Sequence, residues 1–356
     1  MKYQSFVSPH TQFYQLTEPF QLESGDYLEQ VQVAYRSWGT LNAAGDNAVL
    51  ICHALTGNAD ADDWWAPLFG PGCSFDPTTD FILCSNVLGS CYGTTGPTSL
   101  DPRTGATYAL RFPAITIRDM VHLQAQLLTY LGIRRIKQVV GGSLGGMQVL
   151  EWALLYPEWV ESIAVIAASG RHSAWCIGLS ETQRQAIYAD PNWNGGRYNA
   201  ENLPVNGLAV ARMIAMSTYR SWFSFEEKFS RKRQDDLEQP YAIASYLHHQ
   251  GQKLVERFDA NTYIRLTEAM DSHDIGRDRG DYTAILQRIE QPALIVAIES
   301  DVLYPPIEQQ QLAAGMPRAQ LHTLASPHGH DGFLIDMHVL NDVIVTFSRQ
   351  WELLER

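Results

Sequence analysis

Cysteines and basic residues are scarce in this chain of 356 residues, and each shortage excludes a class of protein. The cysteines contain no Cys-x-x-Cys pair, so the sequence indicates neither a disulfide framework nor a zinc site, and we expect no bound metal. The 26 Lys and Arg residues against 39 Asp and Glu residues give a formal net charge of -13. Such a charge disfavours nucleic acid and anionic membranes as partners.

Long apolar runs are also absent. Residues 1–14 lack the apolar segment that marks an export signal, and no stretch approaches the roughly 18 consecutive apolar residues of a membrane span. We find no repeat of fixed period, which disfavours solenoids and propellers. The five scattered cysteines fit a reducing compartment. We therefore expect an unprocessed cytoplasmic protein that is not associated with a membrane.

Short apolar runs bounded by turn residues alternate with helical patterns. The runs have the length of buried strands, and the helical patterns stop at Gly132 and before Pro157. This alternation predicts an α/β protein with a mostly parallel central sheet and helices on both faces. Residues 20–37 alternate more loosely and are expected to open the sheet as antiparallel strands. The expected strands cover 48–52, 81–87, 138–140, 163–167, 293–298 and 321–324, and the expected helices 117–131 and 146–155.

The composition changes between residues 171 and 288. Strand-like runs disappear there, and Met, Trp, Tyr and charged residues follow helical patterns such as 207–219 and 241–255. Strand signals resume at Pro292, so this segment interrupts one sheet. We predict a core domain of residues 1–170 and 289–356 and a helical lid insertion of residues 171–288. An ordinary second domain is the alternative.

The most specific local motif is Gly141-Gly142-Ser143-Leu144-Gly145, which follows an apolar run and precedes a helical pattern. Strand, sharp turn and helix in that order form a nucleophile elbow, in which small neighbours let a strained turn expose the serine hydroxyl. The N–H of Leu144 at the helix start is then a candidate donor to a developing oxyanion. A glycine-rich turn without chemistry is the alternative.

A nucleophilic serine needs a histidine base and a carboxylate that orients it. In folds with this elbow the acid follows a later strand and the histidine comes last. Asp301 follows the expected strand 293–298, and spacing alone does not exclude Glu299. His328 and His330 both lie in the loop after the last expected strand, and position alone does not separate them.

The second oxyanion donor should come from a loop after an early central strand. The segment Cys52-His53-Ala54-Leu55-Thr56-Gly57 follows such a strand, and we predict Leu55 as the donor. His53 precedes the serine in the chain, so we assign it a structural role in this loop and not that of the base.

These motifs together resemble the homoserine O-acyltransferases of the MetX type. The resemblance covers residues 50 to 335, and its joint occurrence is more specific than any single motif. It implies an α/β-hydrolase fold with a helical lid, a homodimer, and acyl transfer from a coenzyme A thioester to the hydroxyl of homoserine. The matching stretches are C-H-A-L-T-G at 52–57, N-V-L-G-S-C-Y-G-T-T-G-P at 86–97, F-P-A-I-T-I-R-D-M-V at 112–121, G-G-S-L-G-G-M-Q-V-L-E-W at 141–152, R-F-D-A-N-T-Y at 257–263, D-S-H-D-I-G-R at 271–277 and G-H-D-G-F-L at 329–334.

The resemblance also implies roles for single residues. The histidine of the G-H-D motif matches His330, and the family's acid matches Asp301 in E-S-D. The substrate-binding positions match Arg212, in G-L-A-V-A-R at 207–212, and Asp331. Homoserine is a zwitterion, so a guanidinium suits its carboxylate and a carboxylate suits its ammonium group. Arg212 as a lid salt-bridge residue and Asp331 as a turn former are the alternatives.

The expected reaction is ping-pong transfer of an acetyl group from acetyl-CoA, through an acyl-Ser143, to homoserine. The product, O-acetylhomoserine, serves methionine synthesis, and no permanently bound cofactor is required. Three alternatives stay open: succinyl-CoA as donor or serine as acceptor, a serine ester hydrolase, and a non-catalytic protein on the same scaffold. The run Arg231-Lys232-Arg233 is either a solvated face or a site for the phosphates of CoA.

Overall fold

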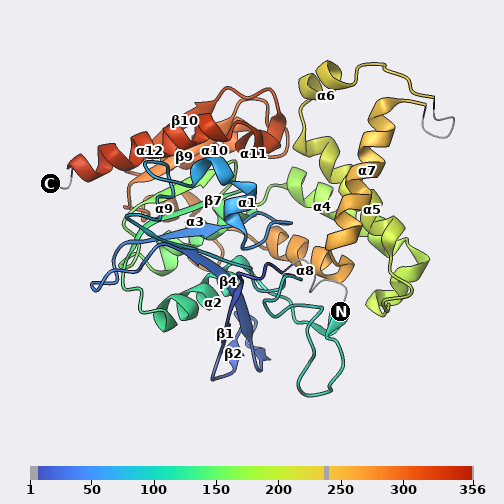
Figure 1. The fold of residues 1–356 in the computed structure, drawn as a ribbon, viewed down its shortest axis with the longest axis horizontal. Coiled ribbons are helices and arrows are strands. Elements are labelled where there is room, and N and C mark those ends of the chain that lie inside the picture. Colours follow the sequence, from blue (N-terminus) through green and yellow to red (C-terminus); the bar gives the residue numbers. More distant parts are fainter. Residues whose placement is uncertain (1–6, 236–239, 355–356) are drawn as a thin grey trace.

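The computed structural model describes residues 7–235 and 240–354 (Figure 1). Its main sheet has eight strands in the order β1-β4-β6-β5-β7-β8-β9-β10. The strands from β6 to β10 run parallel to their neighbours, whereas β4 pairs antiparallel with β1 and β6. The strands are β1 (Gln12–Gln15), β4 (Gln32–Trp38), β5 (Ala48–Cys52), β6 (Phe81–Ser85), β7 (Ile136–Gly142), β8 (Ile163–Ile166), β9 (Ala293–Ile298) and β10 (Ala319–Leu324).

The central strands are buried on both faces. Along β5, Leu50 and Cys52 belong to one apolar cluster, while Val49 and Ile51 belong to the other. Helices α2 (Ile117–Tyr130) and α3 (Leu144–Leu155) contribute to the first cluster. The second lies under α12 (Met337–Leu354), through Leu340, Ile344 and Phe347. Continuous apolar runs are required when both faces of a parallel strand carry helices, and this is why the runs identified the strands.

The strand predictions are confirmed, with small differences at the ends. β6 ends two residues before the expected Val87, and β7 extends over 136–142 beyond the expected 138–140. Helix α3 begins at Leu144, directly after the serine, and not at Gly146.

Of the residues 20–37, only β4 joins the main sheet. β2 (Phe20–Gln21) and β3 (Tyr27–Leu28) pair with each other in a separate small sheet. The sequence interpretation missed β1, which lies at the sheet edge. Three of its four residues are exposed, so it lacks the apolar signal of the central strands.

The segment between β8 and β9 is helical and interrupts the sheet, because these two strands are parallel neighbours. Helices α5 to α7 stand to one side of the sheet in Figure 1, whereas α8 lies close beside it. Buried residues of α8, such as Ile264 and Leu266, join the first apolar cluster. The division at residues 171 and 288 remains a prediction. The helices are α4 (Ala174–Tyr188), η4 (Pro191–Gly196), α5 (Val205–Tyr219), α6 (Trp222–Lys228), α7 (Ala242–Arg257), α8 (Ala260–Asp271) and α9 (Tyr282–Leu286).

Short helices complete the loops at the carboxyl ends of the strands and around the sheet. They are α1 (Ala61–Trp64), η2 (Ala66–Leu68), η3 (Ala109–Arg111), α10 (Pro306–Gly315), η5 (Gly329–Asp331) and α11 (Gly332–Ile335). In the described part of the chain, we find no helix with the length and apolar character needed to cross a membrane.

Candidate active site

Ser143 occupies a strained turn between β7 and α3. Its backbone has φ 57° and ψ -125°, a conformation that L-residues rarely adopt. Two backbone hydrogen bonds hold the turn: the Ser143 N–H donates to the Ile166 carbonyl at 2.9 Å, and the Met147 N–H donates to the Ser143 carbonyl at 3.2 Å. The predicted nucleophile elbow is therefore present in the backbone geometry.

Glycine at 145 lets the start of α3 lie directly against the end of β5. A Cβ atom at Gly145 would lie 2.0 Å from the Cys52 carbonyl oxygen, so any larger residue would force the helix away. This contact brings Leu144 close to the loop that contains Leu55. The backbone N–H groups of Leu55 and Leu144 have no hydrogen-bond partner within the described residues.

Asp301 follows β9 and is 4% exposed. Its Oδ1 accepts hydrogen bonds from the N–H groups of Leu303, at 2.8 Å, and Tyr304, at 3.0 Å. Its Oδ2 lies 2.7 Å from Nδ1 of His330. The side chain of the alternative acid, Glu299, is exposed instead. Asp301 is thus the acid that the fold pairs with a histidine.

His330 is buried among aromatic rings, 5.4 Å from Tyr304, 5.5 Å from Phe333 and 5.7 Å from Tyr219 between ring centroids. Burial by itself lowers the pKa of His330, but the charge of Asp301 and its hydrogen bond outweigh burial and raise it. The alternative, His328, is only half-buried and lies 3.5 Å from a guanidinium nitrogen of Arg220.

Phe333 packs against His330 and against the glycine that precedes Ser143. A Cβ atom at Gly142, next to the serine, would lie 2.7 Å from the Phe333 ring, and that ring packs edge-on against His330. Within the described residues no hydrogen bond joins Ser143 to His330. Catalytic hydrogen bonds often tighten only when substrate is bound, and the pairing of Ser143 with His330 stays a prediction.

The loop at 52–57 is fixed by His53. Its Nε2 accepts a hydrogen bond from the Val87 N–H at 3.1 Å, and its Nδ1 lies 2.8 Å from the Ala54 carbonyl oxygen. Burial lowers the pKa of His53 to about 4, so the ring is neutral. These contacts support the structural role that the sequence interpretation gave to this histidine.

Arg212 comes from α5 of the insertion. Its guanidinium lies 5.2 Å from the centre of the Tyr219 ring, and NH1 is buried without a hydrogen-bond partner in the described part of the chain. Burial raises the pKa of Asp331, and the nearby His330 and Arg212 oppose that shift. The Tyr219 ring connects the two positions, because it lies beside the Arg212 guanidinium and 5.7 Å from the ring of His330, which directly precedes Asp331.

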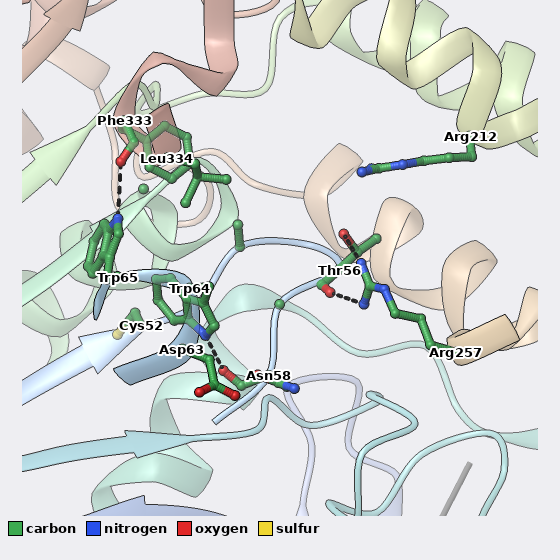
Figure 2. A pocket seen from close by; sticks show the side chains of 13 residues that line it. Cys52, Thr56, Asn58, Asp63, Trp64, Trp65, Arg212, Arg257, Phe333 and Leu334 are labelled. Carbon is green, nitrogen blue, oxygen red and sulfur yellow. Dashed lines mark hydrogen bonds between the residues drawn. The ribbon is translucent and has the colours of Figure 1, made fainter. Parts of the chain in front are cut away.

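Arg212 also lines a cavity of about 360 Å³ that includes Gly142, next to the serine. Figure 2 shows Arg212 and Arg257 entering from one side and the aromatic residues Trp64, Trp65 and Phe333 on the other. The opposite side also includes Asn58 and the Asp63 carboxylate, so the cavity suits a small ligand that has both charged and apolar parts. Sequence reasoning missed Trp64, Trp65 and Arg257. The adjacent tryptophans and the R-F-D-A-N-T-Y motif were the signals that could have found them.

Two further expectations concern charged ligands. The guanidinium groups of Arg231 and Arg233 lie 5.6 and 5.9 Å from the centre of the Tyr241 ring. A role for this basic run in binding CoA remains a prediction. Across residues 7–235 and 240–354, no group of three His, Cys, Asp or Glu side chains is arranged to hold a metal ion.

Comparison with known proteins decides the family. The family described as alpha/beta hydrolase fold matches residues 47–336. A homoserine O-acetyltransferase from Nostoc punctiforme is 68% identical over 97% of this chain and 98% of its own length. This chain belongs to the homoserine O-acetyltransferase family. The resemblance inferred from the motifs and the α/β-hydrolase fold are both confirmed.

Solved structures that resemble this chain include both homoserine O-acetyltransferases and esterases. A homoserine O-acetyltransferase from Bacillus anthracis aligns with a TM-score of 0.88 at 26% identity, covering 95% of this chain and 97% of that one. Esterase E22 aligns with a TM-score of 0.87 at 29% identity, covering 95% of this chain and 99% of that one. Proteins named as homoserine O-acetyltransferases and as esterases therefore share this fold. The fold alone does not distinguish the two activities.

Proposed function

We propose that this protein transfers the acetyl group of acetyl-CoA to the hydroxyl of L-homoserine through an acyl-Ser143 intermediate. The observation that carries the proposal is the 68% identity to the Nostoc homoserine O-acetyltransferase over nearly the whole chain. In the product, O-acetyl-L-homoserine, acetate is a leaving group on the side-chain carbon, so a sulfur nucleophile can displace it in methionine synthesis.

In the first half-reaction His330 takes the proton of the Ser143 hydroxyl, and the serine attacks the thioester carbonyl. Asp301 stays ionised and orients the imidazole, a role that its 2.7 Å contact with Nδ1 supports. The N–H groups of Leu55 and Leu144 stabilise the oxyanion. The tetrahedral intermediate then collapses, and CoA leaves as the thiol after taking the proton from His330.

In the second half-reaction homoserine occupies the cavity beside the acyl-serine. Arg212 binds its carboxylate, and Asp331 binds its ammonium group. The buried NH1 of Arg212, which lacks a partner in the described residues, supports this role. His330 removes the proton of the homoserine hydroxyl, whose oxygen attacks the acetyl ester. His330 then returns the proton to the departing Ser143 oxygen, which regenerates the free enzyme.

The proposal includes several features beyond the reaction. Acetyl-CoA acts as a co-substrate, and no cofactor is bound permanently. The protein works in the cytoplasm as a homodimer, and residues 171–288 form the lid over the core. The lid excludes water from the acyl-serine, which protects the intermediate from hydrolysis.

An ester hydrolase is the second candidate, favoured by the likeness to esterase E22. Water competes with homoserine for any acyl-serine, so the two functions share the nucleophile and differ in the acceptor site. The guanidinium of Arg212, which lines the cavity, favours an acceptor that carries a carboxylate, as homoserine does, over water. Succinyl-CoA as donor or serine as acceptor would keep the same mechanism.

The test is thiol release from acetyl-CoA and from succinyl-CoA by the purified protein, with homoserine, with serine and without acceptor, and with products identified by mass. We expect multiple-turnover release from acetyl-CoA that depends on homoserine and yields O-acetylhomoserine. Continued release without acceptor, beyond the amount that forms the acyl-enzyme, would identify a hydrolase. The Ser143→Ala variant should keep the circular dichroism spectrum of the native fold and form no acyl-enzyme. Full turnover by this variant would contradict the mechanism.

A further inference from the structure

Three motifs that are distant in the sequence meet at the guanidinium of Arg257. Arg257 is the last residue of α7 and opens the R-F-D-A-N-T-Y stretch. Its NH1 donates hydrogen bonds to the Thr56 carbonyl oxygen at 2.7 Å and to the Tyr92 hydroxyl oxygen at 2.6 Å, and its NH2 lies 3.5 Å from Thr56 Oγ1. Thr56 belongs to the C-H-A-L-T-G stretch and Tyr92 to the N-V-L-G-S-C-Y-G stretch.

We infer that Arg257 is a positioning residue that holds the loop of residues 53–57 in the geometry required for oxyanion binding. The inference rests on the proposed function, because Leu55 of this loop is a proposed oxyanion donor. Thr56 directly follows Leu55, so a bond to the Thr56 carbonyl limits rotation of the backbone on the carboxyl side of the donor.

Other contacts also hold this loop, but among the described residues none of them is made to the Thr56 carbonyl oxygen. At one end, Nε2 of His53 accepts a hydrogen bond from the Val87 N–H. Beyond the other end, the Ala59 N–H donates a hydrogen bond to Asn86 Oδ1 at 2.9 Å. Between them the Gly57 N–H closes a turn onto the Ala54 carbonyl at 2.9 Å. The Thr56 carbonyl, next to the donor, is held by Arg257.

Arg257 forms no ion pair within the described part of the chain. No carboxylate there lies within 4.0 Å of its guanidinium, whereas buried or half-buried arginines such as Arg118 and Arg279 pair with Glu151. A partly buried cation without a carboxylate is costly unless hydrogen bonds satisfy it. Two acceptors at 2.6 and 2.7 Å from one nitrogen meet that need, and charge-assisted bonds are stronger than neutral ones.

Arg257 also connects the helical insertion to the oxyanion loop. Figure 2 shows its side chain reaching Thr56 from a helix on the same side of the cavity as Arg212. The helix that carries Arg257, α7, packs extensively on α5, which carries Arg212. A shift of these helices therefore moves both the proposed homoserine-binding guanidinium and the support of the oxyanion loop.

The competing role for Arg257 is direct binding of an anionic substrate group, since it lines the cavity. Steady-state kinetics separate the two roles. Both half-reactions pass through an oxyanion, so a positioning residue affects kcat with little change in KM. A substrate-binding residue would raise KM for homoserine or acetyl-CoA with kcat nearly unchanged.

The test compares Arg257→Met and Arg257→Lys with the native enzyme. Loss of one oxyanion donor costs on the order of 100- to 1,000-fold in kcat, so for Arg257→Met, which loosens a donor, we expect a fall of about 10- to 100-fold. The rate of acyl-enzyme formation from saturating acetyl-CoA without homoserine should fall by a similar factor. Arg257→Lys should retain more kcat than Arg257→Met, because one ammonium group can donate to both acceptors.

Arg265→Met is the matched control. Arg265 donates to the carbonyl oxygens of Leu110, at 2.6 Å, and Phe112, at 3.0 Å, so it also joins the insertion to the core, but it does not line the cavity. We expect a lower Tm with an unchanged kcat. If Arg265→Met lowered kcat as much as Arg257→Met, the effect would be general loosening, and the inference would be wrong.

Tyr92→Phe keeps the test decisive if the Met variant does not fold. It removes one acceptor of Arg257 and leaves the ring in place, and we expect a several-fold fall in kcat with KM unchanged. A native kcat in Tyr92→Phe, or a raised KM with unchanged kcat in Tyr92→Phe or Arg257→Lys, would overturn the inference. A native enzyme that transfers no acetyl group to homoserine would instead overturn the proposed function, so the two failures are distinguishable.

Discussion

Asp301 and Glu299 lie two positions apart after β9, yet the aspartate alone turns inward to a histidine. Three hydrogen bonds define its orientation, two from backbone N–H groups and one with His330. One carboxylate oxygen anchors the acid to its own loop, and the other orients the imidazole. This division of the two oxygens suits a residue that must stay ionised and fixed while the histidine gains and loses a proton.

We expect the Asp301→Asn variant to lose about 10,000-fold in kcat, as in other triads that lose their acid. Its pH profile should also change. His330 must be neutral to accept a proton, so activity falls as the pH decreases through its pKa, which Asp301 raises. Without that charge, burial lowers the pKa of His330, and the acidic limb of kcat/KM moves to lower pH. An unmoved limb would contradict the assignment of His330 as the base.

Sequence reasoning predicted the triad but left neighbouring residues open, and the structure shows the contact between Asp301 and His330. Chain order left two candidates for the base, His328 and His330. Only the family resemblance selected His330. In the structure the choice depends on the turn at Gly329, where φ is 71° and an added Cβ would lie 2.6 Å from the Ser221 backbone nitrogen. Ser221 lies more than 100 positions earlier, so no local pattern contains this information.

At the scale of elements, the approach of α3 to β5 decides whether the oxyanion loop and the elbow can meet. Glycine is required at position 145 because the Cys52 carbonyl occupies the space of a side chain. The helix starts at Leu144 because Ser143, with its positive φ, stands outside the helical conformation. Sequence periodicity reveals neither fact, since both depend on where two backbones touch.

Gly145→Ala should therefore abolish acetyl transfer and lower Tm sharply, because a Cβ 2.0 Å from a backbone oxygen forces α3 away from β5. The control is Gly178→Ala in α4, where nothing lies within 4 Å of an added Cβ. Alanine at such a helical site stabilises by about 0.4–1 kcal/mol, so its Tm should be equal or higher. Thermal unfolding and acetyl transfer are measured together, and a fully active Gly145→Ala enzyme would refute the close approach.

At the scale of the whole molecule, the D-S-H-D-I-G-R stretch joins the end of the insertion to the core. Arg277 pairs with Glu23 at 2.8 Å, and Arg279, just beyond the stretch, pairs with Glu151 at 2.7 Å. Arg118 of α2 contacts both acids. The sequence predicted an insertion in one sheet, but not this charged seam, because its partners come from residues 23, 118 and 151.

His273 in this seam predicts a pH-dependent stability. It is 4% exposed, and burial lowers its pKa to about 3. As the pH falls below 6.5, the unfolded chain binds a proton there and the folded chain does not, which costs about 1.4 kcal/mol of stability per pH unit until the folded pKa is reached. The glutamine of His273→Gln cannot titrate. The difference in free energy of unfolding between the native protein and this variant should therefore be smaller at pH 5.5 than at pH 7.5, by about 1 kcal/mol. Urea unfolding at both pH values measures it, and a constant deficit would contradict the prediction.

The insertion between β8 and β9 also has a consequence for protein synthesis. With the insertion, about 190 residues of chain separate Ser143 from His330. At about 5–20 residues per second, the ribosome makes the serine about 10–40 seconds before the histidine. During that interval the nascent chain carries a nucleophile without its base and cannot be acylated efficiently by cellular thioesters. Acetyl transfer begins only after β10 and the loop that follows it have been synthesised and folded onto the sheet.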